Sequence, residues 1–149
     1  MSELTIRGYE PRDIAAIIAL ELECAGAPQW GEAFWRGFPG DAVLRGVFVA
    51  EIEWQVCGFS VASYAAGIGE LESVAVSARA RRSGLGKMLC ERAIEWALEH
   101  GAKSMELEVR ESNAAALSLY RLIGFVEQGI RPKYYKDPEE DAVLMAAKL

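Results

Sequence analysis

The chain has 149 residues, 52% hydrophobic and 26% charged, proportions typical of a soluble globular protein with a single domain over residues 1–149. Its formal net charge of −6 disfavours nucleic-acid binding, and no apolar run is long enough to cross a membrane. Three scattered cysteines, none in a Cys-x-x-Cys pair, argue against a disulfide framework or a zinc site, so we expect no metal and a reducing, cytoplasmic location.

The first part of the chain predicts a short strand and two helices. Leu4 and Ile6 alternate with polar residues, as in a strand. Pro11 suits the first turn of a helix, which Gly-Ala-Pro at 26–28 ends. The apolar face of this helix is formed by Ile14, Ile17, Ile18, Leu22 and Ala25. A second short helix over 31–38 carries several aromatic residues, which form either a lid and ligand wall or a satellite hydrophobic cluster.

Three strands are predicted after a turn at Pro39-Gly40-Asp41. The segments 47–50 and 56–62 are joined tightly enough to form a hairpin, and the third strand covers 70–76. It leads into the basic turn Arg-Ala-Arg-Arg-Ser-Gly-Leu-Gly-Lys at 79–87, which opens a long helical pattern.

This basic turn is a candidate anion site. A turn that opens a helix presents backbone N–H groups without intrahelical partners, at the positive end of the helix dipole. Gly84 and Gly86 lack Cβ, so a phosphate can approach the backbone. The spacing fits neither a P-loop nor a dinucleotide fingerprint, because Arg81, Met88 and Leu89 stand at required positions. The local chemistry leaves two interpretations equally open, a diphosphate cradle and a solvated basic turn.

The rest of the chain predicts a strand, a helix and two more strands. The long helix ends at His100, whose expected role is capping rather than catalysis. Residues 103–110 alternate, with Met105, Leu107 and Val109 on one face and Glu106, Glu108 and Arg110 on the other. Asn113 is expected to cap a helix over 114–123.

Two last strands are predicted over 125–131 and 142–148, with 132–141 as the connection that contains Tyr134 and Tyr135. The order of elements predicts an α/β fold with a mixed central sheet covered by helices on both faces.

Several pieces of the sequence resemble the GNAT acetyltransferases, and among them the ribosomal-protein-alanine N-acetyltransferases. They are Leu-Glu-Ser-Val-Ala-Val at 71–76, Arg-Arg-Ser-Gly-Leu-Gly at 81–86, Leu-Glu-Val-Arg-Glu-Ser-Asn at 107–113, Leu-Tyr-Arg-Leu-Ile-Gly-Phe at 119–125, and a tail with Tyr134-Tyr135 and Glu-Asp-Ala at 140–142. The first two pieces are general to GNAT folds, and the others are closer to N-terminal acetyltransferases. The N-terminal third matches loosely, mainly through Gln29-Trp30.

The resemblance implies a GNAT fold, acetyl-CoA as the donor, and as the acceptor a protein N-terminus, with alanine of a ribosomal protein as the expected case. It implies Glu108 as general base and Tyr120 as general acid. The strand at 74–76 would offer backbone hydrogen bonds to the pantetheine arm, and the basic turn would hold the diphosphate. The implied cofactor-binding residues are Val74, Ala75, Val76, Arg81, Arg82, Ser83, Gly84, Leu85, Gly86, Lys87 and Asn113.

Alternatives stand beside these roles. Without the resemblance, Glu108 belongs to a solvated charged face and Tyr120 to the core. Glu72 is a second candidate base, and Trp30, Tyr134 and Tyr135 are candidate walls of the acceptor site. No cysteine occupies a matching catalytic place, which favours direct transfer in a ternary complex. A lysine or small-amine acetyltransferase and a non-catalytic CoA-binding module are the alternative functions.

Overall fold

The computed structural model describes residues 3–38 and 43–149, and its elements follow the predicted order. They are β1 (Leu4–Gly8), the 3₁₀ turn η1 (Pro11–Asp13), α1 (Ile14–Glu23), α2 (Gly31–Gly37), β2 (Leu44–Ile52), β3 (Gln55–Ala65), β4 (Ile68–Val76), the 3₁₀ turn η2 (Ala78–Ala80), α3 (Leu85–Glu99), β5 (Ser104–Arg110), α4 (Ala114–Leu122), β6 (Val126–Tyr135) and β7 (Glu140–Lys148). The turn predicted at Pro39–Asp41 lies outside the described residues. Within those residues, no helix has the length and apolar character needed to cross a bilayer.

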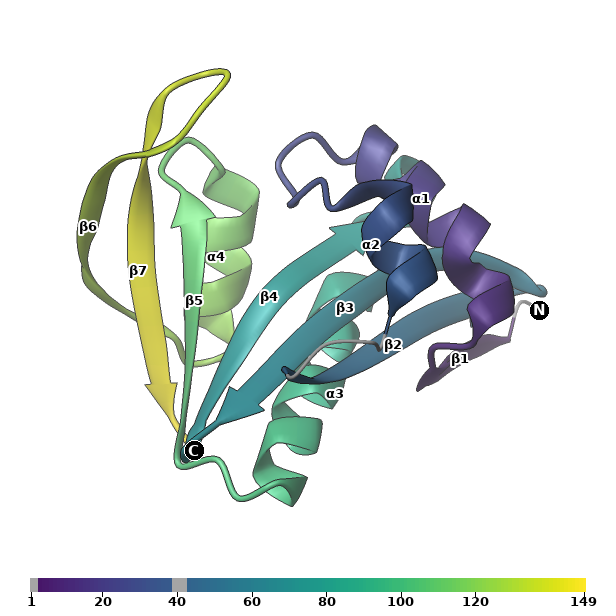
Figure 1. Ribbon diagram of the computed structural model, residues 1–149, viewed down its shortest axis with the longest axis horizontal. Helices are drawn as coiled ribbons and strands as arrows, with labels where there is room; N and C mark the ends of the chain where they lie inside the picture. The colour runs from purple at the N-terminus through teal and green to yellow at the C-terminus, as the bar shows by residue number, and fades with distance from the viewer. Residues whose placement is uncertain (1–2, 39–42) are drawn as a thin grey trace.

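Seven strands form one mixed sheet in the order β1-β2-β3-β4-β5-β7-β6 (Figure 1). β4 and β5 run parallel, while the other neighbouring pairs are antiparallel. The parallel pair requires a crossover connection, and α3 supplies it. The mixed α/β sheet predicted from the sequence is therefore confirmed.

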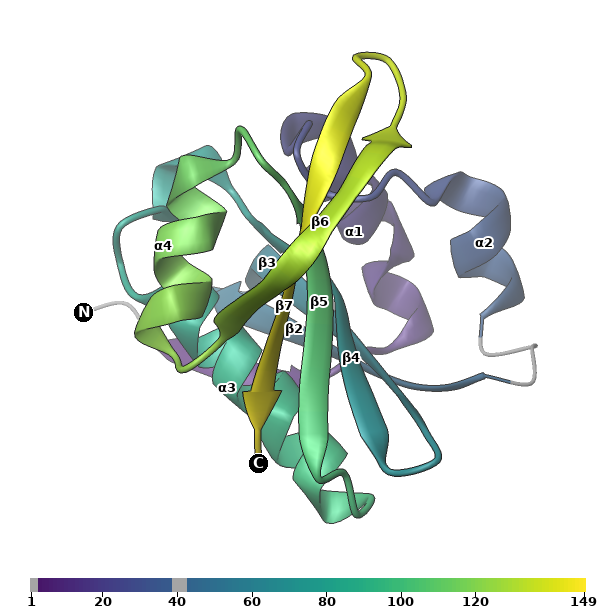
Figure 2. The same ribbon diagram turned by 90° about the vertical axis from the view of Figure 1, so that its left-hand side faces the viewer.

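Helices cover both faces of this sheet, as predicted: α1 and α2 lie on one face, and α3 and α4 on the other (Figures 1 and 2). Successive strand residues point to opposite faces, so β2 contributes to two cores. Val47 and Val49 pack in the cluster that contains Ile17 and Trp35 of the first two helices. Phe48 packs in the cluster that contains Cys90 and Trp96 of α3 and Leu117 of α4.

The buried face of α1 differs from the predicted one. Leu22 is 76% exposed, and Ala25 lies beyond the end of the helix. The buried positions after Ile17 are Leu20 and Glu21 instead. The Glu21 carboxylate accepts hydrogen bonds from Trp35 Nε1 and from the backbone N–H of Gly31, both at 3.0 Å. Glu21, hydrogen-bonded to Gly31 and Trp35, thus occupies a position where hydrophobic periodicity predicts an apolar residue.

β6 is longer than predicted, since the sequence placed its end at Arg131 and put Tyr134 and Tyr135 in the connection. The predicted strand ends one residue before Pro132, and proline cannot donate to a sheet ladder. β6 is an edge strand, and its register with β7 is interrupted between Arg131 and Tyr135, so proline is tolerated there. Both tyrosines are therefore held at the end of a strand.

Two predicted helix caps are confirmed. The Asn113 side chain accepts a hydrogen bond from Ala116 N at 3.2 Å at the start of α4. His100 is the C-cap residue of α3, and its Nδ1 lies 2.8 Å from Trp96 O. Its ring also contacts the Trp96 ring in a tilted arrangement, with centroids 4.4 Å apart, so this histidine serves the helix end.

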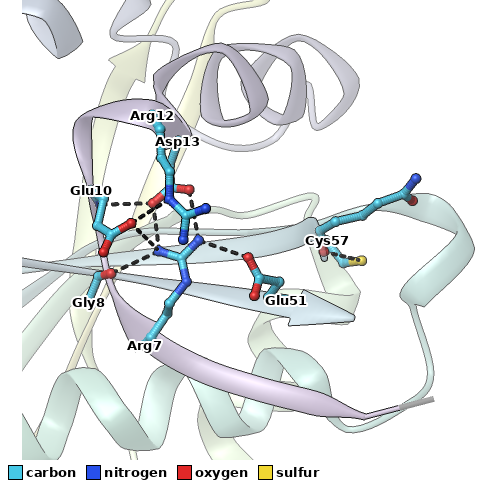
Figure 3. A network of polar contacts seen from close by, with 8 residues as sticks. Arg7, Gly8, Glu10, Arg12, Asp13, Glu51 and Cys57 are labelled. Carbon is cyan, nitrogen blue, oxygen red and sulfur yellow. Dashed lines mark hydrogen bonds and ion pairs between the residues drawn. The ribbon is translucent and has the colours of Figure 1, made fainter. Parts of the chain in front are cut away.

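An ion-pair network connects β1 to η1 and β2 (Figure 3). Arg7 donates to both carboxylate oxygens of Asp13, at 2.8 and 2.9 Å, and to Glu51 at 2.9 Å. Burial alone raises the pKa of the buried Asp13 carboxyl, but hydrogen bonds from Arg7 and from Glu10 N outweigh it, and the pKa falls below its ordinary value. The charged form of Asp13 therefore stabilises this corner of the fold.

Candidate active site

A cleft of about 1100 Å³ opens where β4 and β5 separate. The two strands pair only over three positions, which end at Glu70 and Glu106, and they diverge beyond them (Figure 1). On the other side of β4, Ser73 pairs with Val61 and Leu71 with Ala62, so Glu72 forms a bulge. A bulge bends its strand, which is consistent with the separation of β4 from β5.

The cleft brings together predicted site residues that lie far apart in the sequence. Those that line it are Trp30, Glu72, Val74, Ala75, Val76, Arg81, Glu108, Asn113, Tyr120, Tyr134 and Tyr135. The rest of the basic turn, from Arg82 to Lys87, lies outside this lining. The structure thus places the predicted catalytic and acceptor residues around one space, with the basic turn beside it.

The edge of β4 presents backbone groups to the cleft. Ser77 N donates to Cys57 O of β3 at 2.7 Å, so by strand alternation the polar groups of Val74 and Val76 point toward the cleft. Those of Ala75 point toward β3. Val76 O already accepts hydrogen bonds from Arg81 Nε at 3.1 Å and Cys24 Sγ at 3.4 Å.

The two glycines of the basic turn serve different purposes. Gly84 precedes α3 with a φ of +80°, a conformation that favours glycine, and a Cβ added there would meet no other atom within 4 Å. Beside it lie the first N–H groups of α3, which have no intrahelical partner. A Cβ on Gly86 would lie 3.3 Å from Leu119 Cδ2 of α4, so Gly86 permits close packing of two helices.

Several side chains of the basic turn have partners within the protein. Leu85 is buried in a core cluster with Leu89. Ser83 Oγ donates to Ala80 O, and Lys87 Nζ lies 3.3 Å from Glu91. The open features of this turn are therefore its backbone at Gly84 and the exposed side chain of Arg82.

Glu108 lies on the β5 wall of the cleft, 26% exposed, among residues of β6. Its carboxylate is 3.1 Å from Arg131 Nη1. A hydrogen bond to this carboxylate raises the pKa of Tyr134. Burial, followed by the charge of Glu108, raises the pKa of Tyr135 to about 12. Both phenols are protonated at neutral pH and present hydroxyl groups near the carboxylate.

Tyr120 packs against the core and also lines the cleft, so its position is compatible with both interpretations that the sequence left open. Its ring makes a T-shaped contact with Phe125, with centroids 6.0 Å apart. Burial, with smaller effects of Cys90 and Tyr135, raises the pKa of Tyr120 well above its ordinary value. The phenol therefore carries a proton throughout the neutral range.

The wall of the cleft around Glu70 and Glu72 is acidic. Glu72 pairs with Arg45 at 2.8 Å, and the Arg45 guanidinium also lies 5.4 Å from the Phe34 ring centroid of α2. Burial, followed by the charges of Glu72, Glu108 and Glu106, raises the pKa of Glu70. This wall favours a cationic ligand, whereas the turn before α3 favours an anionic one.

Two residues around the cleft escaped the sequence analysis, Glu21 and Ser73. The aromatic cluster around fully buried Trp35 is mainly core, but Trp30 at its edge lines the cleft. Glu21 holds this edge in place, since its carboxylate accepts from the N–H groups of Trp30 and Gly31. The available signal was an acidic residue on the apolar face of α1. The other residue is Ser73, which lines the cleft with a buried side chain and had no distinguishing sequence pattern.

Known proteins resemble this chain in both sequence and fold. The model of the Acetyltransferase (GNAT) family matches residues 14–125. The [ribosomal protein bS18]-alanine N-acetyltransferase of Escherichia coli strain K12 is 33% identical over 144 residues, which cover 95% of each chain. An N-alpha-acetyltransferase of Sulfurisphaera tokodaii is 36% identical over 110 residues, or 73% of this chain and 65% of that protein. The crystal structure of the ribosomal-protein-S18-alanine N-acetyltransferase from Escherichia coli has a TM-score of 0.83 at 32% identity, covering 98% of this chain and 94% of that one.

Proposed function

The chain belongs to the GNAT acetyltransferase family, and on that premise we propose that it transfers acetyl from acetyl-CoA to the N-terminal amine of a protein. The observation that carries the proposal is the cleft, where a carboxylate, a protonated phenol and an acidic wall lie beside a helix start suited to anions. The expected acceptor begins with alanine, as the name of the Escherichia coli relative suggests. The expected location is the cytoplasm, because the cysteines are free and scattered.

GNAT enzymes use acetyl-CoA, which supplies the acetyl group as a thioester. The residues beside the cleft fit such a molecule. The open backbone at Gly84 and the first N–H groups of α3 would hold the diphosphate, with Arg82 adding positive charge. The cleft-facing groups of Val74 and Val76 would bind the pantetheine arm, and Asn113 would add a contact from the opposite wall.

Glu108 and Tyr120 would divide the proton transfers. A free α-amine has a pKa of about 7.7–8.0, so about a tenth is neutral at pH 7 and a carboxylate base is sufficient. As the amine nitrogen bonds to the acetyl carbon and the C–S bond breaks, Glu108 takes a proton from the nitrogen, directly or through water. Tyr120 gives its hydroxyl proton to the departing sulfur, whose thiol has a pKa of about 8.5.

The acidic wall formed by Glu70, Glu72 and Glu108 supports an amine as the acceptor, because it attracts a cation into the cleft. A lysine side chain, with a pKa of about 10.4, is far more protonated at pH 7 and is a harder substrate for the same base. The α-amine is therefore the proposed acceptor.

The proposal is tested with one peptide in two forms, one with a free N-terminal alanine and blocked lysine, the other with a blocked N-terminus and free lysine. Each form is incubated with the protein and acetyl-CoA, and mass spectrometry locates the acetyl group. We expect acetylation of the free N-terminus. Acetyl found mainly on the lysine form would overturn the acceptor assignment, and absence of any transfer would favour a CoA-binding module. Variation of the first residue then measures the preference for alanine.

A further inference from the structure

Ser73 is a buried polar residue on the wall of the cleft. It is 4% exposed, it lines the cleft, and within the described part of the chain its Oγ has no hydrogen-bond partner. Burial of a hydroxyl without a partner is unfavourable, so such groups in native proteins call for an explanation. Ser60 on the adjacent strand shows the usual solution, since its buried Oγ donates to Leu89 O at 3.0 Å.

The face toward which Ser73 points follows from the sheet register. Its cross-strand partner is Val61, which packs in the cluster with Trp35 on the side of α1 and α2. Directly paired residues of antiparallel strands project to the same face. Glu72 lies on this face as well, because it pairs with Arg45, whose guanidinium lies over Phe34 of α2. The Ser73 side chain therefore projects to the same face as Glu72, which is the acidic side of the cleft.

The charges around Ser73 indicate what it binds. Glu70, Glu72 and Glu108 line the same cleft. Arg45 and Arg131 pair with the last two, but the three carboxylates outnumber these arginines and disfavour an oxyanion or a phosphate. They attract a ligand group that donates hydrogen bonds. A serine oxygen accepts such bonds, and an amine is the donor that the reaction brings to this place.

We propose that Ser73 Oγ accepts a hydrogen bond from the acceptor's amine and orients it toward the acetyl group. This inference rests on the proposed function and adds a substrate-positioning residue to it. The amine has more than one N–H, so it can donate to Ser73 while Glu108 takes the proton that leaves. The lone pair of the nitrogen is then fixed in direction before the C–N bond forms.

The first test compares Ser73→Ala with Ser60→Ala. For Ser73→Ala we expect kcat/KM for the acceptor peptide to fall about 10- to 100-fold, as for loss of one hydrogen bond to an ionisable donor. Calorimetric affinity for acetyl-CoA and the Tm should stay at wild-type values, because no internal bond is lost. For Ser60→Ala we expect the reverse, a lower Tm and an unchanged kcat/KM.

A second pair of variants separates the hydroxyl from the shape of the side chain. Ser73→Thr and Ser73→Val have nearly the same shape, but only threonine keeps the hydroxyl. We expect the threonine variant to exceed the valine variant in peptide kcat/KM and in calorimetric affinity for the peptide in the presence of CoA. Equal values for the two, or an unchanged kcat/KM in Ser73→Ala, would overturn the proposal. So would an effect confined to acetyl-CoA binding.

Failure of the proposed function gives a different result. If the wild-type protein acetylates only the lysine form of the peptide, the α-amine assignment is wrong. The same four variants, measured with that lysine form, still show whether Ser73 holds the attacking amine.

Discussion

Glu108 is the residue on which the proposed proton transfer depends, and its surroundings suit a base. Arg131, its ion-pair partner, is half exposed, so the carboxylate is in contact with solvent as well as with the cleft. Glu72 lies across the cleft in an ion pair in which both side chains are largely buried. The more enclosed pair makes Glu72 the less available of the two carboxylates.

We predict that Glu108→Gln lowers kcat at pH 7 by about 10²- to 10⁴-fold, the usual effect of losing a general base. The loss should shrink as the pH rises through about 8, because the α-amine becomes neutral without help. Steady-state kinetics from pH 6 to 9 measure this, with Glu72→Gln as the control. If Glu72→Gln loses its rate at pH 7 while Glu108→Gln keeps it, Glu72 is the base.

Tyr120 should tolerate loss of its hydroxyl without loss of its fold, because its ring contacts with Phe125 survive in phenylalanine. We predict that Tyr120→Phe binds acetyl-CoA normally and loses kcat within the general-acid range of about 10²- to 10⁴-fold. Kinetics, calorimetry and a melting curve check this. A near-normal kcat together with a lowered Tm would show that this tyrosine serves only the core.

At the level of single residues, local rules predicted some positions and could not predict others. Asn113 follows from capping chemistry, and the cleft face of Glu108 follows from strand alternation, since both depend on nearby residues. The surroundings of Glu21 and Ser73 are created by the fold, which gives Glu21 its hydrogen-bond partners and places Ser73 on the cleft wall. Their importance could not be recognised until Trp35 was seen on one side and the cleft on the other.

Among the elements, the turn before α3 carries the proposed cofactor site, and Gly84 is its most sensitive position. Its φ of +80° strains any other residue, and a side chain would fill the open space beside the backbone. We predict that Gly84→Val weakens acetyl-CoA binding severely and lowers the free energy of unfolding by about 1–2 kcal/mol. Calorimetry and urea unfolding measure the two effects.

Gly67 offers a matched control, since it has a φ of +85° and equally open surroundings in the turn between β3 and β4. Gly67→Val should show a similar loss of stability with unchanged acetyl-CoA affinity. Wild-type affinity in a folded Gly84→Val protein would contradict the proposed diphosphate site.

The elements also show where sequence patterns fail. Periodicity placed every strand and helix in the correct order, yet it ended β6 at Arg131, one residue before Pro132. Proline is compatible with a strand when that strand forms a sheet edge. Edge position depends on β7 inserting between β5 and β6, which is a long-range property of the chain.

For the molecule as a whole, acid stability should depend on the network around Arg7. Because the folded-state pKa of Asp13 lies below its unfolded value of about 3.9, Asp13 stabilises the protein above that pH. The contribution is lost as the pH falls through the depressed folded value. Resistance to mild acid is therefore expected from this corner.

We predict that Asp13→Asn lowers the free energy of unfolding by about 2 kcal/mol at pH 7. The reason is that Arg7 loses its ion pair with the buried carboxylate of Asp13. The difference from wild type should narrow below about pH 4. Urea unfolding at several pH values measures both. Glu32→Gln is the control, because its ion pair with Arg36 is exposed on both sides and should contribute little. A gap that is constant with pH would refute the electrostatic account.

The irregular outer edge of β6 also bears on the tendency of the protein to aggregate. A long, regular outer strand invites other chains to join it and is a hazard for fibril formation. Here Pro132 removes one donor, the register breaks between Arg131 and Tyr135, and Lys133 has a φ of +53°. If the acceptor is a polypeptide, as proposed, an extended acceptor chain that reaches the neighbouring cleft meets an interrupted row of backbone groups on this strand. This interruption disfavours pairing of that chain, or of a second copy of the protein, with β6.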